Sequence, residues 1–328
     1  MVGRDYYFYT REIVAELRDT FGASVSFHSI EPAAFLYRLS KKIGMPVTWW
    51  LRRYHRNVIE RERHPRPDIV LFIQVHQIGD MVRAYREAFG SAHFVLYNWD
   101  SVQTHDYRAY VRYFDKVFTF DRADAMRVPG AEYLPLFFSE RFRRLRSQQE
   151  AIYDMSFVGV TVTVRRYDQL AALRGWAKAN GIALFDYVVV SPFLYFKLLL
   201  RGKLLRRVHF RSLGERALLR IYGRSRAVLD LPNNVQSGYT MRTFESLGAH
   251  RKLVTANRGI VNEDFYTPES VFVIGALGEM PDRTFLYSPP RFSPAIDSYF
   301  LRSWILRLLD PVIIRAPDSN RAGEPAVG

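Results

Sequence analysis

The polar stretch 233–245 (NNVQSGYTMRTFE) contains the residue types that bind a phosphorylated ligand. It lies between two short apolar segments, which we interpret as buried strands, and its second half has helical spacing. Gly238 would let the backbone approach a ligand closely, and the helix N-terminus that follows offers amide groups to an anion. Arg242 adds a positive charge for a diphosphate, and Glu245 adds a carboxylate for ribose hydroxyls. An ordinary loop with a helix cap is the alternative interpretation.

Two residues in the first half of the chain have the chemistry of a general base. His76 follows the apolar segment 68–74, and Asp100 follows the apolar segment 92–97. Ligands of a parallel sheet bind beyond the carboxyl ends of its strands, where a carboxylate or an imidazole can remove a proton from a hydroxyl nucleophile. The alternatives are an ordinary loop histidine for His76 and a helix or turn cap for Asp100. We interpret Asp121, after a third such segment, as a helix cap.

The order of apolar and amphipathic segments predicts the fold class. Short apolar segments alternate with helix-patterned segments, as they do in parallel α/β sheets. The charged stretch 141–150 (RFRRLRSQQE) interrupts this alternation, and the pattern then starts again. We therefore predict two tandem Rossmann-like doubly wound domains, at 1–148 and 149–290. A helix at 291–310 would pack back on the first domain, and 311–328 would form a flexible tail.

The start of the chain departs from this pattern. A domain of this type normally opens with an apolar strand that leads into its first helix. Here only seven residues precede the amphipathic segment 8–21, and they do not form an apolar run. We therefore expect the first strand of the first domain to be missing.

The composition argues against several kinds of site. The 328 residues include no cysteine, which excludes disulfides and thiolate metal sites. No apolar run reaches about 18 residues, so no membrane-spanning helix is predicted. The sequence lacks the motifs GxGxxG, GxxxxGK[ST] and HExxH, and it contains no Asp-x-Asp pair. We therefore expect neither an essential metal nor a cofactor.

The net charge of +14 predicts an anionic partner. Residues 35–66 carry nine Lys or Arg against two Glu, and residues 197–211 carry six Lys or Arg and no acid. Both stretches are also rich in apolar or aromatic side chains, which suits an interface with anionic lipid head groups. Two solvated basic helices are the alternative. We assign membrane or acceptor binding to Trp49, Trp50, Arg52, Arg53 and Arg56. No recognised nucleic-acid-binding motif is present, so we expect no nucleic-acid partner.

One pattern resembles a known family. The run Gln236-x-Gly238-x-Thr240-x-Arg242-x-x-Glu245-x-Leu247-Gly248, followed by Lys252-Leu-Val-Thr-x-Asn257, looks like the C-terminal half of bacterial glycosyltransferases with the GT-B fold. It is most similar to the CgeB-like members and to those of lipopolysaccharide or capsule assembly. The segments 97–101, 118–121 and 156–159 also resemble this family.

The resemblance implies that the second domain binds a nucleoside diphosphate sugar and that the first binds the acceptor. The donor-binding residues would be Arg165, Gln236, Ser237, Gly238, Thr240, Arg242 and Glu245. Among them, Glu245 would match the family's glutamate that contacts the donor ribose. The sequence departs from the family's Glu-x7-Glu pattern, because Ser237 occupies the earlier position. The resemblance therefore does not imply a retaining mechanism.

These observations predict a metal-independent glycosyltransferase, peripheral on the cytoplasmic face of the plasma membrane. It would move a sugar onto a cell-surface polysaccharide or a lipid-linked acceptor. A sugar-nucleotide epimerase on the same fold is one alternative, and it would act on the donor alone. A degenerate subunit that binds glycan or scaffolds an assembly is another, favoured by the expected loss of the first strand.

Overall fold

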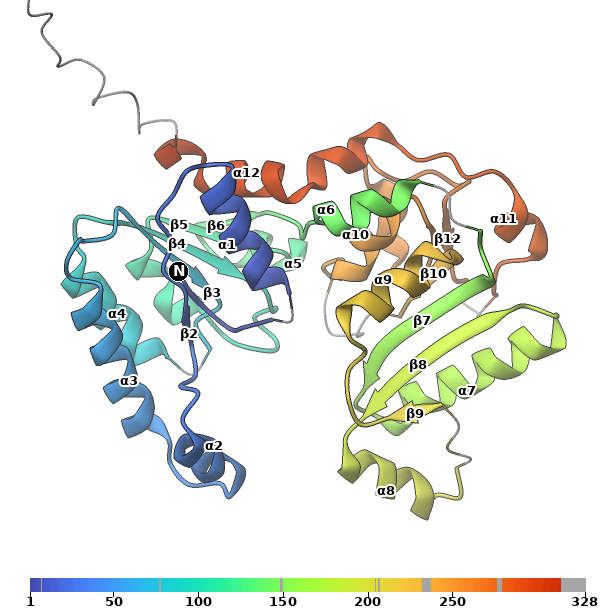
Figure 1. Cartoon of the computed structure of the whole chain (residues 1–328), viewed down its shortest axis with the longest axis horizontal. Coiled ribbons are helices and arrows are strands. Elements are labelled where there is room, and N and C mark those ends of the chain that lie inside the picture. The colour runs from blue at the N-terminus through green and yellow to red at the C-terminus, as the bar shows by residue number, and fades with distance from the viewer. Residues whose placement is uncertain are drawn as a thin grey trace, which may run out of the picture. The chain divides into compact units, whose positions relative to one another are not determined.

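The computed structural model describes residues 1–6, 8–76, 78–147, 150–203, 205, 207–231, 237–275 and 279–313. Among these residues the chain divides into two units. The first holds residues 1–135, 237–238 and the helix that begins at Leu301, and the second holds residues 136–231 and 239–300. Each unit contains one six-stranded sheet in which every pair of neighbouring strands is parallel (Figure 1). The predicted pair of doubly wound, Rossmann-like domains is confirmed.

The first sheet has the strand order β2-β1-β3-β4-β5-β6. Its strands are β1 (Val2–Gly3), β2 (His28–Ser29), β3 (Ile69–Ile73), β4 (His93–Asn98), β5 (Lys116–Thr119) and β6 (Ala131–Tyr133). The helical segments of this unit are α1 (Tyr9–Asp19), α2 (Phe35–Lys42), α3 (Thr48–Arg61), α4 (Gly79–Ala88), η1 (Arg108–Tyr113), α5 (Arg122–Arg127) and α12 (Leu301–Ile313).

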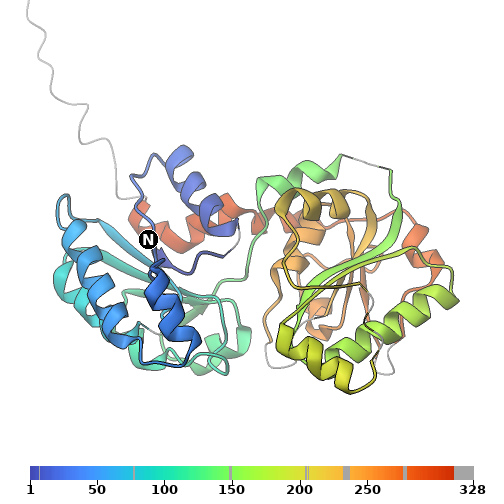
Figure 2. The same ribbon diagram turned by 60° about the horizontal axis from the view of Figure 1, so that its bottom comes forward.

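The central strands of this sheet are apolar on both faces because helices cover both. Val70 and Phe72 of β3 pack in one core cluster with residues of α3 and α4. On the other face, Tyr97 of β4 packs edge-on against Trp304 of α12, with ring centroids 4.8 Å apart. Helix α12 also packs on α1 (Figure 2). The continuous apolar runs that predicted buried strands are thus explained by two-sided burial.

The expectation that the first strand is missing is wrong. β1 lies between β2 and β3, with Val2 in register with His28 on one side and with Phe72 on the other. Val2 is buried, and a side chain at Gly3 would meet Cβ of Ile73 at 2.9 Å. A strand of two residues has no periodicity, so its place in the sheet is visible only from its neighbours.

Two other segments of the first unit show the same limit. The segment 23–30 has a strand-like composition, which predicts a strand, yet only His28–Ser29 pairs in the sheet. The segment 106–114 has the pattern of a short helix, and Arg108–Tyr113 within it forms the 3-10 helix η1. A short segment of this kind is compatible with more than one local structure, and packing decides between them.

The second sheet has the order β12-β11-β10-β7-β8-β9. Its strands are β7 (Tyr153–Thr161), β8 (Leu184–Val190), β9 (Val208–His209), β10 (Ser225–Asp230), β11 (Lys252–Thr255) and β12 (Val271–Val273). The helical segments are α6 (Glu140–Arg143), η2 (Arg144–Arg146), α7 (Val164–Ala179), α8 (Pro192–Leu200), α9 (Glu215–Gly223), α10 (Met241–Gly248), η3 (Arg258–Asn262), α11 (Arg283–Tyr287) and η4 (Pro294–Tyr299).

The stretch 141–150, which we predicted to be a linker, instead contributes to the core of the second unit. Phe142 in α6 is fully buried and packs against Tyr222, with ring centroids 5.7 Å apart. The buried guanidinium of Arg251 donates to the carbonyl oxygen of Leu145 at 2.8 Å, and to those of Tyr222 and Gly223 at the end of α9. In the sequence, the many charged residues of this stretch mask the buried anchor Phe142.

The division between the units also falls earlier in the chain than we predicted. The first unit ends at Pro135 rather than near residue 148, and the chain returns to it at Leu301. The predicted terminal helix consists of η4, which belongs to the second unit, and α12, which belongs to the first. Of the predicted tail 311–328, residues 311–313 instead belong to α12, and the rest lies outside the described residues. Along the described chain, no helix is both long enough and apolar enough to cross a membrane.

A buried histidine makes the first unit sensitive to acid. His55 of α3 is fully buried, with Nε2 2.9 Å from the carbonyl oxygen of Ile30 and Nδ1 3.0 Å from the hydroxyl of Tyr85. The carbonyl can only accept, so Nε2 carries the proton and Nδ1 accepts from Tyr85. Burial lowers the pKa of this imidazole to about 4.

We predict that His55 makes the protein less stable as the pH falls from 7 to 4. The unfolded state binds the proton more tightly, so the contribution of His55 is complete above pH ~6.5 and is lost as the pH falls towards the folded pKa, by about 3 kcal/mol in total. Thermal unfolding at several pH values should show a shallower acid slope for His55→Gln than for wild type. The exposed His64→Gln is the control and should keep the wild-type slope. Equal slopes for all three proteins would contradict the prediction.

Candidate active site

The carboxyl edge of the first sheet carries a cluster of polar side chains. β1, β3 and β4 are neighbours, and the residues that follow them include Tyr6, Gln74 and Asp100. Gln74 has a φ of +69°, which is uncommon for a residue with a side chain, and its side chain is buried. Its backbone amide donates to the carbonyl oxygen of Tyr97 at 3.0 Å. A strained backbone of this kind is found mostly at functional sites.

The side chain of Gln74 joins the ends of two strands. Its Oε1 accepts a hydrogen bond from the hydroxyl of Tyr6 at 2.9 Å, and its Nε2 donates to Oδ2 of Asp100. Burial, together with the charge of Asp100, raises the pKa of Tyr6, so the tyrosine stays a neutral donor. The amide therefore fixes the position of the Asp100 carboxylate. About a quarter of the Asp100 side chain remains exposed, at 23%.

Two histidines complete the cluster. The carbonyl oxygen of Ser101 accepts from the amides of Thr104 and His105, both at 2.9 Å, which turns the loop back toward the strand end. Nε2 of His105 lies 3.7 Å from Oδ2 of Asp100. The ring of His105 also stacks on the ring of His76, with centroids 3.6 Å apart. His105 therefore contacts both of the residues that the sequence singles out as candidate bases.

The electrostatics of the cluster favour a neutral His76. Burial, then the neighbouring His105 and the cations Arg4 and Lys41, lower the pKa of its imidazole. A neutral imidazole has a lone pair that can accept a proton, and the Asp100 carboxylate is a second acceptor nearby. The cluster is thus equipped to deprotonate a hydroxyl or a carbon acid. Within the described ranges, no three His, Asp or Glu side chains form a group that could hold a metal ion.

In the second unit, Asp230 at the end of β10 organises the predicted donor residues. Its carboxylate is buried and accepts from the hydroxyls of Thr240 at 2.8 Å and Thr243 at 3.1 Å. It also pairs with Nη1 of Arg242 at 2.8 Å, while Nη2 of Arg242 donates to the carbonyl oxygen of Val158 at 2.9 Å. These contacts tie the first turn of α10 to strands β7 and β10.

This arrangement makes Arg242 a fixed charge with little exposure. Burial opposes its charge, but Asp230 beside it outweighs that effect and raises the pKa of the guanidinium. A side chain at Gly159 would lie 3.2 Å from Nη2 of Arg242 and 2.9 Å from the ring of Phe157. Gly159 is therefore required for the close packing above this arginine.

The remaining predicted donor residues lie in different surroundings. Glu245 is only 3% exposed and accepts a hydrogen bond from the hydroxyl of Tyr222 at 3.5 Å, inside the unit. Arg165 is exposed on the first turn of α7, whereas Arg166 donates to the carbonyl oxygen of Leu231 at 2.6 Å. Gln236 lies outside the described residues.

Ser237 and Gly238 are held by Asp121 in the first unit. The carboxylate of Asp121 accepts from the amide of Ser237 at 2.9 Å and from the amide of Gly238 at 3.4 Å. It also caps α5, as the sequence predicted, through the amides of Ala123 and Asp124. A side chain at Gly238 would meet the ring of Phe120 at 2.5 Å. Gly238 therefore lets the backbone lie close against the ring of Phe120. The amides of Ser237 and Gly238 donate to the Asp121 carboxylate in this structure.

The residues assigned to the membrane or acceptor lie on α3. Trp49 is 61% exposed and contacts Trp50 edge-on, with centroids 5.1 Å apart. The guanidinium of Arg53 lies 5.6 Å from the Trp49 ring, and that of Arg52 pairs with Asp80 at 2.6 Å. Arg56 is exposed as well. Helix α2 adds the exposed apolar side chains Phe35, Leu36 and Leu39 to this surface, and Ile43 and Met45 follow the helix.

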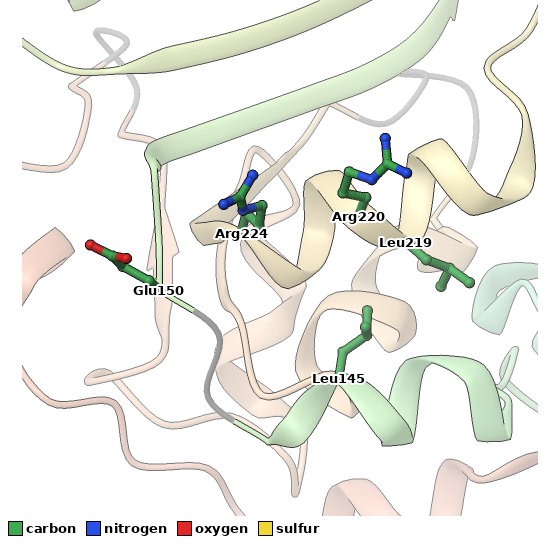
Figure 3. Close-up of a pocket in the computed structure, with 5 residues that line it drawn as sticks. All are labelled: Leu145, Glu150, Leu219, Arg220 and Arg224. Atoms are coloured by element: carbon green, nitrogen blue, oxygen red, sulfur yellow. The ribbon is translucent and has the colours of Figure 1, made fainter.

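An open hollow in the second unit does not coincide with these residues. It is lined by Leu145, Glu150, Leu219, Arg220 and Arg224 (Figure 3). Arg224 directly precedes β10, and Glu150 lies shortly before β7. The hollow therefore lies at the amino ends of these strands, the edge opposite to the one at which parallel sheets bind their ligands. We assign it no part in the reaction.

Sequence reasoning found two of the five residues in the first cluster. Asp100 and His76 follow strands directly, which was the signal used. Tyr6 and Gln74 follow strands too, but phenol and amide side chains are not bases, so a strand-end position alone does not single them out. His105 lies several residues beyond its strand, so only the turn at Ser101 brings it into place. Asp230 is not evident as a functional residue in the sequence, because it is the last residue of an apolar strand.

Comparison with known proteins identifies the fold. No protein-family model matches the chain, and no curated protein matches it. Among solved structures, the UDP-N-acetylglucosamine 2-epimerase from Rickettsia bellii is similar, with a TM-score of 0.56 and 11% identity over 95% of this chain and 96% of that one. The UDP-GlcNAc 2-epimerase from Methanocaldococcus jannaschii has a TM-score of 0.51 and 11% identity over 94% and 98%. The lipopolysaccharide outer core galactosyltransferase WaaB has a TM-score of 0.48 and 14% identity over 95% of each chain.

The two six-stranded parallel sheets with their alternating helices define the GT-B fold. Solved structures similar to this chain include both glycosyltransferases and sugar-nucleotide epimerases. At these identities the similarity establishes the fold, and function has to be argued from the site.

We predict that Arg242→Ala destabilises the second unit strongly, because it leaves the buried Asp230 carboxylate without its cation. Breaking a buried ion pair costs about 3–5 kcal/mol. The same substitution in an Asp230→Ala background should cost clearly less, which urea unfolding of the four proteins would show. Arg216→Ala, on the exposed face of α9, is the control and should change stability by about 0.5 kcal/mol or less. Equal costs in both backgrounds would mean that the two residues do not act as a pair.

Proposed function

We propose that this protein is a glycosyltransferase that uses a nucleoside diphosphate sugar as its donor. The observation that carries the proposal is the cluster in which Gln74 holds Asp100 beside His105 and His76, at the ligand-binding edge of a GT-B sheet. Asp100 or His76 would remove the proton from the acceptor hydroxyl as it attacks the anomeric carbon of the sugar. The nucleoside diphosphate would leave with the bonding electrons.

In this proposal the second unit binds the donor. Arg165 is exposed at the N-terminus of α7, where backbone amides and the helix dipole also favour a phosphate. Arg242 would contribute a fixed positive charge that stabilises the departing diphosphate without a metal. Thr240 and Glu245 are the other donor residues of this unit that we propose. Gln236, Ser237 and Gly238, which the sequence also assigns to the donor, are left out of this proposal, because Ser237 and Gly238 belong to the first unit and their amides bond to Asp121 there.

The surface on α2 and α3 favours a transferase over an epimerase. Phe35 and Trp49 are 72% and 61% exposed, and the guanidinium of Arg53 lies 5.6 Å from the Trp49 ring. Such a surface suits an acceptor that is lipid-linked or that lies at an anionic membrane. An epimerase acts on its sugar nucleotide alone and has no need of this surface. We therefore propose a surface-polysaccharide or lipid-linked acceptor, of the bacterial lipopolysaccharide or capsule type, used at the cytoplasmic face of the plasma membrane.

An epimerase is the second candidate, supported by the two neighbours with TM-scores above 0.5, whose names state that activity. A base at a strand end would serve proton abstraction from the sugar equally well. The two functions differ in whether an acceptor is needed. The scaffold alternative loses its support, because β1 is present in the first sheet, between β2 and β3.

A screen of uridine, guanosine and cytidine diphosphate sugars by thermal shift tests donor binding. A ligand at about 100 times its Kd adds about 2.7 kcal/mol to the free energy of unfolding, so the matching donor should raise the Tm by several degrees. Arg165→Ala should reduce that rise without lowering the Tm of the ligand-free protein, since the side chain is exposed. Arg216→Ala should leave the rise unchanged. No shift with any nucleotide sugar would refute a donor site.

We predict that Asp100→Asn lowers turnover by about 10²–10⁴-fold, the usual contribution of a general base. The asparagine oxygen can still accept from Gln74, so the donor-induced Tm shift should persist. Turnover is measured as nucleoside diphosphate release and glycolipid formation, with the donor from the screen and a bacterial lipid extract as acceptor. Asp106→Asn is the matched control, because Asp106 lies in the same loop with its carboxylate on Arg108.

The same assay separates the two candidate functions. Product that requires the lipid extract supports the transferase. An isomerised nucleotide sugar formed without extract would identify an epimerase. Full activity of Asp100→Asn and of His76→Gln would show that the chemistry lies elsewhere.

A further inference from the structure

Helix α8 exposes an apolar face that the core of the second unit does not use. Phe193, Phe196 and Leu200 are 79%, 63% and 89% exposed. The opposite face is anchored, because Leu194 and Leu198 are buried in the core cluster. Figures 1 and 2 show α8 at the margin of the unit, next to α7. The helix is thus apolar around most of its circumference and only half covered.

The local sequence makes this helix a firm element. Ser191 caps its N-terminus by accepting from the amide of Leu194 at 3.1 Å, and Pro192 occupies the first turn. Phe210, after β9, is 56% exposed and packs edge-on against Tyr195 of α8, with centroids 5.1 Å apart. Phe210 therefore extends the apolar face beyond the helix. With nine residues α8 is too short to span a bilayer, but a helix of this kind can lie in the interface.

The stretch of sequence that contains α8 carries only positive charge. Residues 187–214 include six Lys or Arg and no Asp or Glu. Lys203 and Arg207 pair with Asp168 and Asp186, at 2.8 Å in each case. Lys197, Arg201 and Arg211 are exposed, and none of the described residues forms an ion pair with them. The apolar face thus has a rim of cations that an anionic surface would satisfy.

We propose that α8 and Phe210 insert into a lipid bilayer that contains anionic phospholipid, with Lys197, Arg201 and Arg211 at the head groups. A second copy of this chain is a poorer occupant, because its own α8 would bring the same positive charges into contact. The proposal extends the suggested membrane association to the second unit, and it rests on no catalytic assignment.

Tryptophan fluorescence of the full-length Phe196→Trp variant tests directly whether α8 inserts into a bilayer. The probe is a two-to-one mixture of phosphatidylcholine and phosphatidylglycerol in vesicles, compared with phosphatidylcholine alone. We expect the emission to shift to shorter wavelength with the anionic vesicles, relative to wild type, because the indole moves into an apolar medium. In co-sedimentation, Phe193→Ser/Phe196→Ser should weaken binding to the anionic vesicles about ten-fold or more.

A matched control variant and three possible outcomes test the insertion of α8 into anionic bilayers. Met126→Ser removes an equally exposed apolar side chain from α5, at 78%, and should leave vesicle binding unchanged. An unshifted emission of the Phe196→Trp variant would overturn the proposal even if the surface on α2 and α3 still binds vesicles. Equal binding to neutral vesicles would overturn the anionic requirement. If Phe193→Ser/Phe196→Ser instead dissociates an oligomer in lipid-free buffer, the face is a protein interface. The donor-induced Tm shift needs no lipid, so a failure here is distinguishable from a failure of the proposed function.

Discussion

Two-sided burial of parallel strands is the constraint from which the functional geometry follows. Because helices cover both faces of the first sheet, its central strand β3 is apolar throughout, and β4 is apolar between its two ends. The polar groups of these strands therefore lie where the strands end, and in a parallel sheet all the carboxyl ends lie at one edge. In the first unit this places Gln74 and Asp100 next to each other, after β3 and β4. In the second it places Asp230 beside the first turn of α10.

The two edges use their buried polar groups differently. In the second unit every described contact of Asp230 is internal, and its carboxylate fixes Arg242 and two threonines as a rigid support. In the first unit the supported group, Asp100, remains partly exposed, and the strained Gln74 behind it is the buried member. A buried support beneath an exposed acid or base is the arrangement that holds a reactive side chain in one geometry. This difference is the reason for proposing that the chemistry takes place at the first edge and that the second edge binds the charged ligand.

The apolar and basic surfaces bear on which function the fold performs. GT-B domains with TM-scores above 0.5 here belong to epimerases, and fold alone does not distinguish them from transferases. An enzyme confined to soluble sugar nucleotides gains nothing from exposed Phe35, Trp49 or Phe193, which reduce solubility. Their occurrence beside clustered arginines and lysines is explained if the protein works at an anionic membrane. These surfaces are therefore our reason to propose an acceptor. The fold by itself gives no information on whether an acceptor is used.

The sequence by itself determined the fold class, most strands and helices, the clustering of basic residues with aromatic ones, and the candidate bases His76 and Asp100. These are local properties, because periodicity and strand-end position can be read from neighbouring residues. Only the tertiary structure decided that Val2–Gly3 is a strand, that Phe142 anchors the supposed linker, and that His105 reaches Asp100. It also decided that the amides of Ser237 and Gly238 bond to Asp121. Each of these depends on a contact between residues far apart in the chain or on a turn of the backbone, and neither leaves a periodic signal in the sequence.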